Sequence, residues 1–173
     1  MNIVYSISAI LILVVMFIQD IKFRAITWYL FPALMIMFSL YSINQSGIRD
    51  MMFNTSVNLG FLLLQLVLLT IYFSIKNKRF IWITNDYLGI GDILFFVCIA
   101  FLFSPMNFIF FYLISLVVIV LGYLFMVLFR KSVSTVPLAG LQAILVIPLL
   151  LLNHFFSLII TSDHLIVNFL LVQ

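Results

Sequence analysis

Long apolar runs separated by short polar segments make up most of this chain. Each run is long enough, or nearly so, to cross a bilayer as an α-helix, which takes about 17–25 mainly apolar residues. A helix is expected because a spanning segment must satisfy its own backbone hydrogen bonds. The runs cover residues 3–19, 28–43, 56–75, 88–103, 107–129 and 136–152. We therefore predict an all-α integral membrane protein, a bundle of about six transmembrane helices.

The C-terminal segment, residues 154–173, fits this pattern less well. Asp163 and His164 interrupt it, and neither half is long enough to span alone. It could form a seventh short span, a re-entrant piece or an amphipathic helix at the interface. The N-terminal run lacks a basic start and a small-residue cleavage site, so we expect a retained first span. With no internal repeat and no low-complexity linker, residues 1–173 are predicted to form a single transmembrane domain.

The composition supports a membrane protein and excludes several other classes. Hydrophobic residues make up 66% of the chain and charged residues 8%, which is too little polar surface to cover a soluble core. The one cysteine, Cys98, excludes an intramolecular disulfide and a CxxC zinc site. His154 and His164 have only Asp163 nearby, so we expect neither a metal nor a cofactor. The formal charge is +3. In a membrane protein Lys and Arg mainly mark the cytoplasmic loops, so we do not expect nucleic acid as a partner.

The basic residues predict the orientation of the bundle. Seven of the eight follow the first, third and fifth apolar runs, which all end on the same side of the membrane. Only Arg49 lies in a loop on the other side. The seven are Lys22, Arg24, Lys76, Lys78, Arg79, Arg130 and Lys131. Cytoplasmic loops of membrane proteins carry an excess of Lys and Arg. We therefore expect a multi-pass protein of the cell (inner) membrane with its N-terminus outside.

Two acids are predicted to lie at similar depth near the cytoplasmic face. Asp20 lies at the inner end of the first run, and Asp92 lies about one turn into the fourth run, after Gly89 and Gly91. Ionisable residues within a membrane are costly and are candidates for function. An ordinary helix-end anchor is the alternative for Asp20, and close helix packing around small residues is the alternative for Asp92.

A pair of neighbouring carboxylates suits aspartic-protease chemistry. Two carboxylates in one site cannot both ionise cheaply, so they share a proton and can activate a bound water. One acts as general base on water, and the other protonates the carbonyl oxygen or the leaving amine. Asp92 is near a helix N-terminus, which favours the anion, and Asp20 is near a helix C-terminus, which disfavours it. Asp92 is thus the better candidate for the base.

The same residues carry a resemblance to a known family. Asp20 with the basic stretch after it, followed later by a G-x-G-D at residues 89–92, resembles the type IV prepilin peptidases and the archaeal preflagellin peptidases. These are membrane aspartic proteases with a GxGD signature. Asp86, three residues before the first glycine, and the proline segment at residues 136–140 are also similar to the family. The resemblance covers nearly the whole chain.

The resemblance implies a peptidase that removes the short basic leader of prepilin-like or preflagellin-like precursors at the cytoplasmic membrane boundary. Asp20 and Asp92 would be the catalytic pair. Six other residues would bind substrate or shape the site: Asp86, Tyr87, Gly89, Gly91, Pro137 and Gly140.

The chain also departs from the family pattern. Thr27 stands where members often have proline, Leu94 where they often have lysine, and Gly140 at the usual second proline of the last motif. The cysteine-bearing segment of the larger members is missing, which argues against N-methylation. The exact substrate and the oligomeric state do not follow from the sequence.

Three other functions are also compatible with the sequence. A presenilin-like protease shares GxGD, but two apolar runs separate Asp20 from Asp92 here. A transporter or proton-coupled channel would use the aspartates as ion ligands. A scaffold subunit of a secretion machine would use them structurally and would tolerate Asp→Asn changes.

Overall fold

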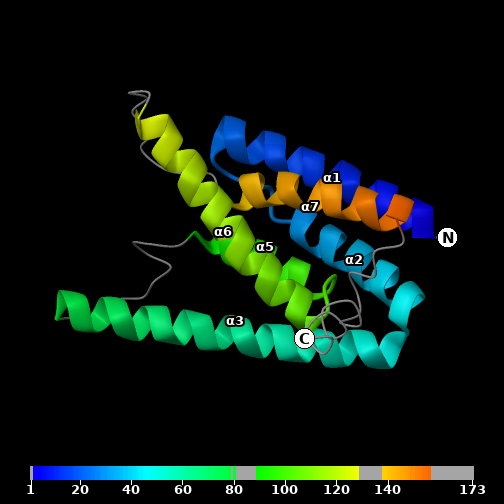
Figure 1. Cartoon of the computed structure of the whole chain (residues 1–173), viewed down its shortest axis with the longest axis horizontal. Helices are drawn as coiled ribbons and strands as arrows, with labels where there is room; N and C mark the ends of the chain where they lie inside the picture. Colours follow the sequence, from blue (N-terminus) through cyan, green and yellow to red (C-terminus); the bar gives the residue numbers. More distant parts are fainter. Residues whose placement is uncertain (1, 79, 81–88, 129–137, 157–173) are drawn as a thin grey trace, which may run out of the picture.

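The computed structural model describes residues 2–78, 80, 89–128 and 138–156, and within these ranges helices are the only regular secondary structure (Figure 1). The helices are α1 (Asn2–Phe23), α2 (Leu30–Ser46), α3 (Ile48–Asn77), α5 (Ile90–Ala100), α6 (Pro105–Leu128) and α7 (Leu138–Phe156). They occur in the order of the six predicted spans. The prediction of an all-α membrane bundle is therefore confirmed. Residues 157–173 lie outside the described ranges, and with them most of the proposed seventh segment.

The helices differ in length more than the apolar runs predict. Three of the described helices are long and apolar enough to cross a membrane: Ile3–Phe23, Ile48–Asn77 and Pro105–Phe125. The others are shorter, and α5 has only 11 residues. At 1.5 Å per residue α5 rises about 16 Å, roughly half of a hydrocarbon core of about 30 Å. The predicted span at residues 88–103 is therefore a short helix that cannot cross the membrane alone.

Gly47 determines where α3 begins, and Asn58 determines where α5 ends. A single residue, Gly47, separates α2 from α3, and its φ of +87° is a conformation that suits glycine. This break lets α3 begin at Ile48, eight residues before the predicted run. At the other site, the Asn58 side chain of α3 donates hydrogen bonds to the carbonyls of Ala100 (3.0 Å) and Phe103 (2.8 Å). These bonds cap the end of α5.

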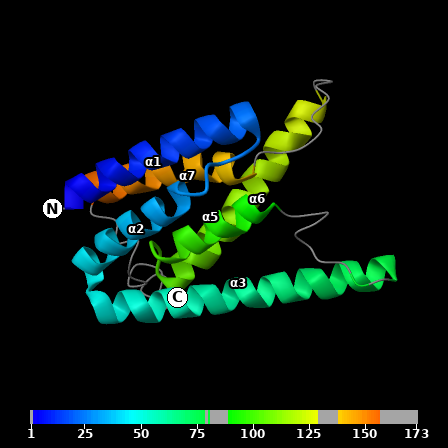
Figure 2. The ribbon, with the colours of Figure 1, turned by 180° about the vertical axis from the view of Figure 1, so that it is seen from behind.

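Successive helices run in alternating directions. The ends of α1, α3 and α6 and the starts of α2, α5 and α7 all point toward the left of Figure 1, and toward the right in the reverse view of Figure 2. Of the five basic residues that the structure describes, Lys22, Arg24, Lys76 and Lys78 belong to this end, whereas Arg49 is in the first turn of α3 at the other end. The uneven distribution of basic residues along the sequence thus places most of the described ones at one end of the bundle.

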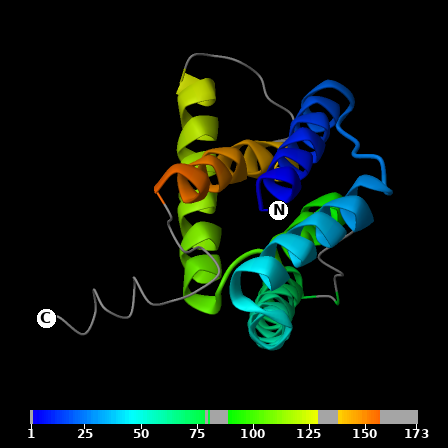
Figure 3. The same ribbon diagram turned by 90° about the vertical axis from the view of Figure 1, so that its right-hand side faces the viewer.

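The core joins all six described helices. α7 packs along α1 and also contacts α5 and α6, while α2 packs against α1, α3 and α5. Figure 3 shows α7 crossing α6 and passing beside α1. Large side chains that are fully buried fill the space between them, including Leu13, Met16, Leu34, Phe38, Phe95 and Phe108. The start of α7 thereby lies beside the end of α1 and the start of α5, and it contacts the middle of α6 at Ser115.

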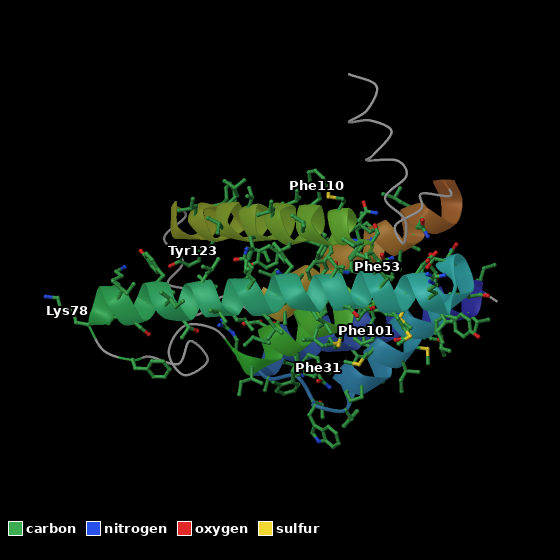
Figure 4. The ribbon with its side chains drawn as sticks, turned by 90° about the horizontal axis from the view of Figure 1, so that it is seen from below. Phe31, Phe53, Lys78, Phe101, Phe110 and Tyr123 are labelled. Atoms are coloured by element: carbon green, nitrogen blue, oxygen red, sulfur yellow. The ribbon has the colours of Figure 1, made fainter. Side chains whose placement is uncertain are left out.

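Apolar side chains also cover the outside of the bundle. On α3 and α6, residues such as Phe53, Leu64, Leu68, Phe110 and Val117 are exposed, and Figure 4 shows Phe53 and Phe110 on these outer surfaces. Contiguous apolar surface of this extent marks contact with lipid or protein. The protein is therefore a helical membrane protein whose outer surface suits a lipid environment.

Candidate active site

Asp20 lies in the last turn of α1 and is almost completely buried, with 9% of its surface exposed. Its Oδ2 accepts a hydrogen bond of 2.6 Å from the backbone N–H of Gly140. Its own carbonyl accepts the N–H of Arg24 at 3.0 Å, where the chain leaves the helix with a φ of +54°. Asp20 is therefore held at a helix end, and its carboxylate is turned toward another helix.

Asp92 is the third residue of α5 and is half-buried. Its Oδ1 accepts a hydrogen bond of 2.9 Å from the backbone N–H of Ala139. Its own N–H donates to the carbonyl of Gly89 at 3.1 Å, in the turn that begins α5. Asp92 is thus held at a helix start, with its carboxylate also directed at α7.

The two carboxylates meet at one helix N-terminus. Ala139 and Gly140 are consecutive residues in the first turn of α7, where backbone N–H groups have no partner within the helix. The positive end of the helix dipole is at the same place. The structure therefore brings together two acids that lie 72 positions apart in the sequence, and the N–H donors offset the repulsion between them.

The glycines of the site have different roles. A Cβ on Gly140 would lie 2.8 Å from Cβ and 2.9 Å from Oδ2 of Asp20, so any side chain there would force Asp20 or the backbone to shift. A Cβ on Gly89 would lie 3.1 Å from Oδ2 of Asp92, a tight contact with a side-chain end. A Cβ on Gly91 would make an ordinary 3.8 Å contact with Phe31. A side chain at Gly89 would thus crowd the Asp92 carboxylate, whereas one at Gly91 would make only an ordinary contact.

Other predicted site residues are not described. Asp86, Tyr87 and Pro137 lie outside the described ranges. The backbone of Ala139 was missed by sequence reasoning, because a backbone N–H carries no signal in the residue type. Within the described part of the chain, no three His, Cys, Asp or Glu side chains are grouped so that they could hold a metal ion.

The contacts with α7 alter the predicted asymmetry of the pair. Asp20 and Asp92 both accept an N–H from the start of α7. Their positions at the end of α1 and the start of α5 are therefore not enough to tell which of the two carries the negative charge. Their exposure still differs, since Asp20 is buried and Asp92 is half-buried. Asp92 is the carboxylate that water reaches more easily.

A buried polar link also holds α7 against α6. Gln142, two residues after Gly140, is fully buried, and its Nε2 donates to the hydroxyl oxygen of Ser115 at 3.3 Å. The Ser115 hydroxyl in turn donates to the carbonyl of Tyr112 at 3.0 Å. Burying a polar group costs free energy unless it is hydrogen-bonded, so the bond from the Gln142 Nε2 favours this placement of the first turns of α7. The Gln142 Oε1 is buried without a hydrogen-bond partner in the described part of the chain.

No protein family model, curated protein or solved structure matches the chain. The likeness to prepilin peptidases therefore rests on the motif residues themselves and on their order along the chain.

Proposed function

We propose that the protein is a membrane aspartic endopeptidase that cleaves the short basic leader of prepilin-like precursors. The observation that carries this proposal is the convergence of Asp20 and Asp92 on consecutive N–H groups of α7. A paired-carboxylate mechanism requires that both acids reach one substrate bond. In this bundle they come from different helices, so the pairing is a property of the fold.

In the proposed reaction Asp92 acts on water and Asp20 acts on the peptide. Asp92, the more exposed carboxylate, takes a proton from water as its oxygen bonds to the scissile carbonyl carbon. Asp20, protonated at the start, gives its proton to the carbonyl oxygen. The carbon–nitrogen bond then breaks as the leaving amine takes up the proton held by Asp92, and a hydroxyl of the tetrahedral diol returns a proton to Asp20 as the new carboxyl group forms. The products are the free leader and the shortened precursor, and the enzyme regains its starting charge.

The location of the pair fits a leader peptidase. The acids lie at the bundle end that carries four of the five described basic residues, which the positive-inside rule places in the cytoplasm. We propose that this end faces the cytoplasm of a bacterial-type inner membrane, with the N-terminus outside. A precursor with a cytoplasmic leader and an apolar helix in the bilayer would present its cleavage site at this depth.

A cleavage assay in membranes tests the proposal. The chain is co-expressed with a prepilin-like precursor, and wild type is compared with Asp20→Asn and Asp92→Asn. Both variants are expected to lose cleavage by at least about 10³-fold, because Asn cannot exchange a proton in this mechanism. Asp50→Asn, in the first turn of α3 at the other end of the bundle, is the matched control and should cleave normally. Cleavage by either site variant at equal expression would exclude the two-aspartate mechanism.

A scaffold role is the second candidate, and the same contacts favour it. Both carboxylates act as caps for unpaired N–H groups of α7, a structural function that needs no chemistry. The side-chain oxygen of Asn can accept the same bonds. A scaffold therefore predicts that the Asn variants keep both their stability and the function of the membrane complex, whereas a protease keeps only the stability.

A further inference from the structure

One side chain closes the connection between α1 and α2. The Gln19 Oε1 accepts two hydrogen bonds from Thr27, one from the backbone N–H at 2.9 Å and one from the hydroxyl at 2.8 Å. Both residues are half-buried. The bonds join positions eight residues apart and span the end of α1, so they determine how the chain turns back into α2. We call this pair the Gln19–Thr27 clamp.

The clamp acts directly beside Asp20. Gln19 precedes Asp20 in the last turn of α1, and Arg24 ends that turn by donating its N–H to the Asp20 carbonyl. On the other side, the Thr27 carbonyl accepts the N–H of Leu30 at 3.1 Å, at the start of α2. A single residue, Thr27, is therefore bonded both to the end of α1 and to the beginning of α2.

From α2 the contacts continue to Asp92. Phe31, in the first turn of α2, is buried at the contact with α5 (Figure 4), and its ring faces Gly91. Its carbonyl accepts a hydrogen bond from the Cys98 Sγ of α5 at 3.3 Å. Because Gly91 precedes Asp92, the position of Phe31 affects the position of the second carboxylate. A continuous series of contacts thus links the residue before Asp20 to the residue before Asp92.

We propose that the Gln19–Thr27 clamp is a positioning device that sets the placement of Asp20 relative to Asp92. As a statement about catalysis it rests on the proposed function. Misplacing reacting groups by about 1 Å can lower a reaction rate about 10²-fold. Loss of a clamp beside one of the two carboxylates should therefore lower the turnover rate.

The departures from the resembled family support this role. Thr27 and Gly140 stand where that family often has proline, and proline has no N–H. In this chain both N–H groups are used, by Gln19 and by Asp20. A proline at either position would therefore remove a hydrogen bond, to Gln19 at position 27 and to Asp20 at position 140.

The first test measures geometry and needs no activity. Spin labels are placed on Phe23→Cys and Ile90→Cys, at the ends of α1 and α5, which are 63% and 65% exposed. Cys98 is fully buried and should remain unlabelled. The distance distribution should be narrow in the parent protein. Gln19→Ala should broaden or shift it most, Thr27→Val should do so less because the N–H bond remains, and Thr27→Ser should match the parent.

The second test measures turnover of a prepilin-like precursor. We expect kcat to fall about 5-fold in Thr27→Val and about 30-fold in Gln19→Ala, from the loss of one or two hydrogen bonds beside Asp20, with KM nearly unchanged. The double variant should be no worse than Gln19→Ala alone, because both changes remove the same interaction. Thr70→Val is the matched control, since it removes a threonine hydroxyl bond (to the Leu66 carbonyl, 2.7 Å) far along α3.

The two tests separate failure of the clamp from failure of the proposed function. A broadened distribution in Gln19→Ala, with wild type inactive on every precursor, would support the clamp as a device of the fold and count against the peptidase. An unchanged distribution in Gln19→Ala would overturn the clamp, whatever the activity. Equal effects of Thr27→Ser and Thr27→Val would overturn it as well, because the serine hydroxyl should restore the bond.

Discussion

Gly140 controls how closely Asp20 approaches α7. Its N–H donates to the Asp20 carboxylate, and its missing side chain leaves room for the Asp20 Cβ. The obstacle to a larger residue is a Cβ attached to the backbone, which cannot swing aside like the end of a flexible chain. At this position the usual preference of helices for alanine over glycine, about 1 kcal/mol, should therefore be reversed.

We expect Gly140→Ala to lower the free energy of unfolding by about 1–3 kcal/mol, as overpacking does, and to reduce precursor cleavage by about 10-fold or more. Thermal unfolding in detergent and the cleavage assay measure the two effects. Gly60→Ala in α3 is the matched control, because its new methyl group would meet nothing within 4 Å. A Gly140→Ala protein as stable and active as Gly60→Ala would show that the close approach is not required.

At the level of helices, the short α5 depends on α3 for its end. Asn58 is 1% exposed and donates to the carbonyls of Ala100 and Phe103. These carbonyls lie where the 11-residue helix α5 ends inside the bundle. A longer helix would supply N–H donors for them from its next turn, and here that turn is missing. The cap therefore allows α5 to start at the depth of Asp92 and still end within the core.

Asn58→Leu should destabilise the protein by about 2–4 kcal/mol, because it leaves two buried carbonyls without their donor. The measurement is the unfolding midpoint in a fixed detergent. Asn77→Leu, which removes an exposed side-chain bond to the Phe73 carbonyl on the same helix, should change stability by only about 0.5 kcal/mol. Similar losses in the two variants would argue against a specific role for the cap.

For the whole molecule, the alternating helices and the charge distribution predict which end faces the cytoplasm. Lys78 follows the end of α3, and Arg49 is in its first turn, both exposed. A membrane-impermeant thiol reagent applied to intact cells should label Arg49→Cys, and should label Lys78→Cys only after permeabilisation. The parent protein, whose Cys98 is buried, gives the background. Labelling of Lys78→Cys first would invert the proposed orientation.

Much of the architecture is readable from the pattern of apolar residues, because lipid imposes the same requirement on every spanning segment. The order of the six described helices and the end that carries the basic residues both follow from it. Helix lengths do not follow from it. Gly47 allows α3 to begin early through its own positive φ, and Asn58 allows α5 to end early through hydrogen bonds from a different helix. The residues near the end of α5 do not by themselves reveal this second contact.

The candidate site divides in the same way. Asp20 and Asp92 stand out in the sequence because charge is unusual in apolar runs. Gly89 and Gly140 stand out because they belong to the segments that resemble the GxGD peptidases. That the two carboxylates converge was decided by tertiary packing, which sets the start of α7 between α1 and α5. The groups that join them are backbone N–H donors, which nearly every residue possesses. Residue type can therefore identify the acids, and only the fold can select the two amides that hold them together.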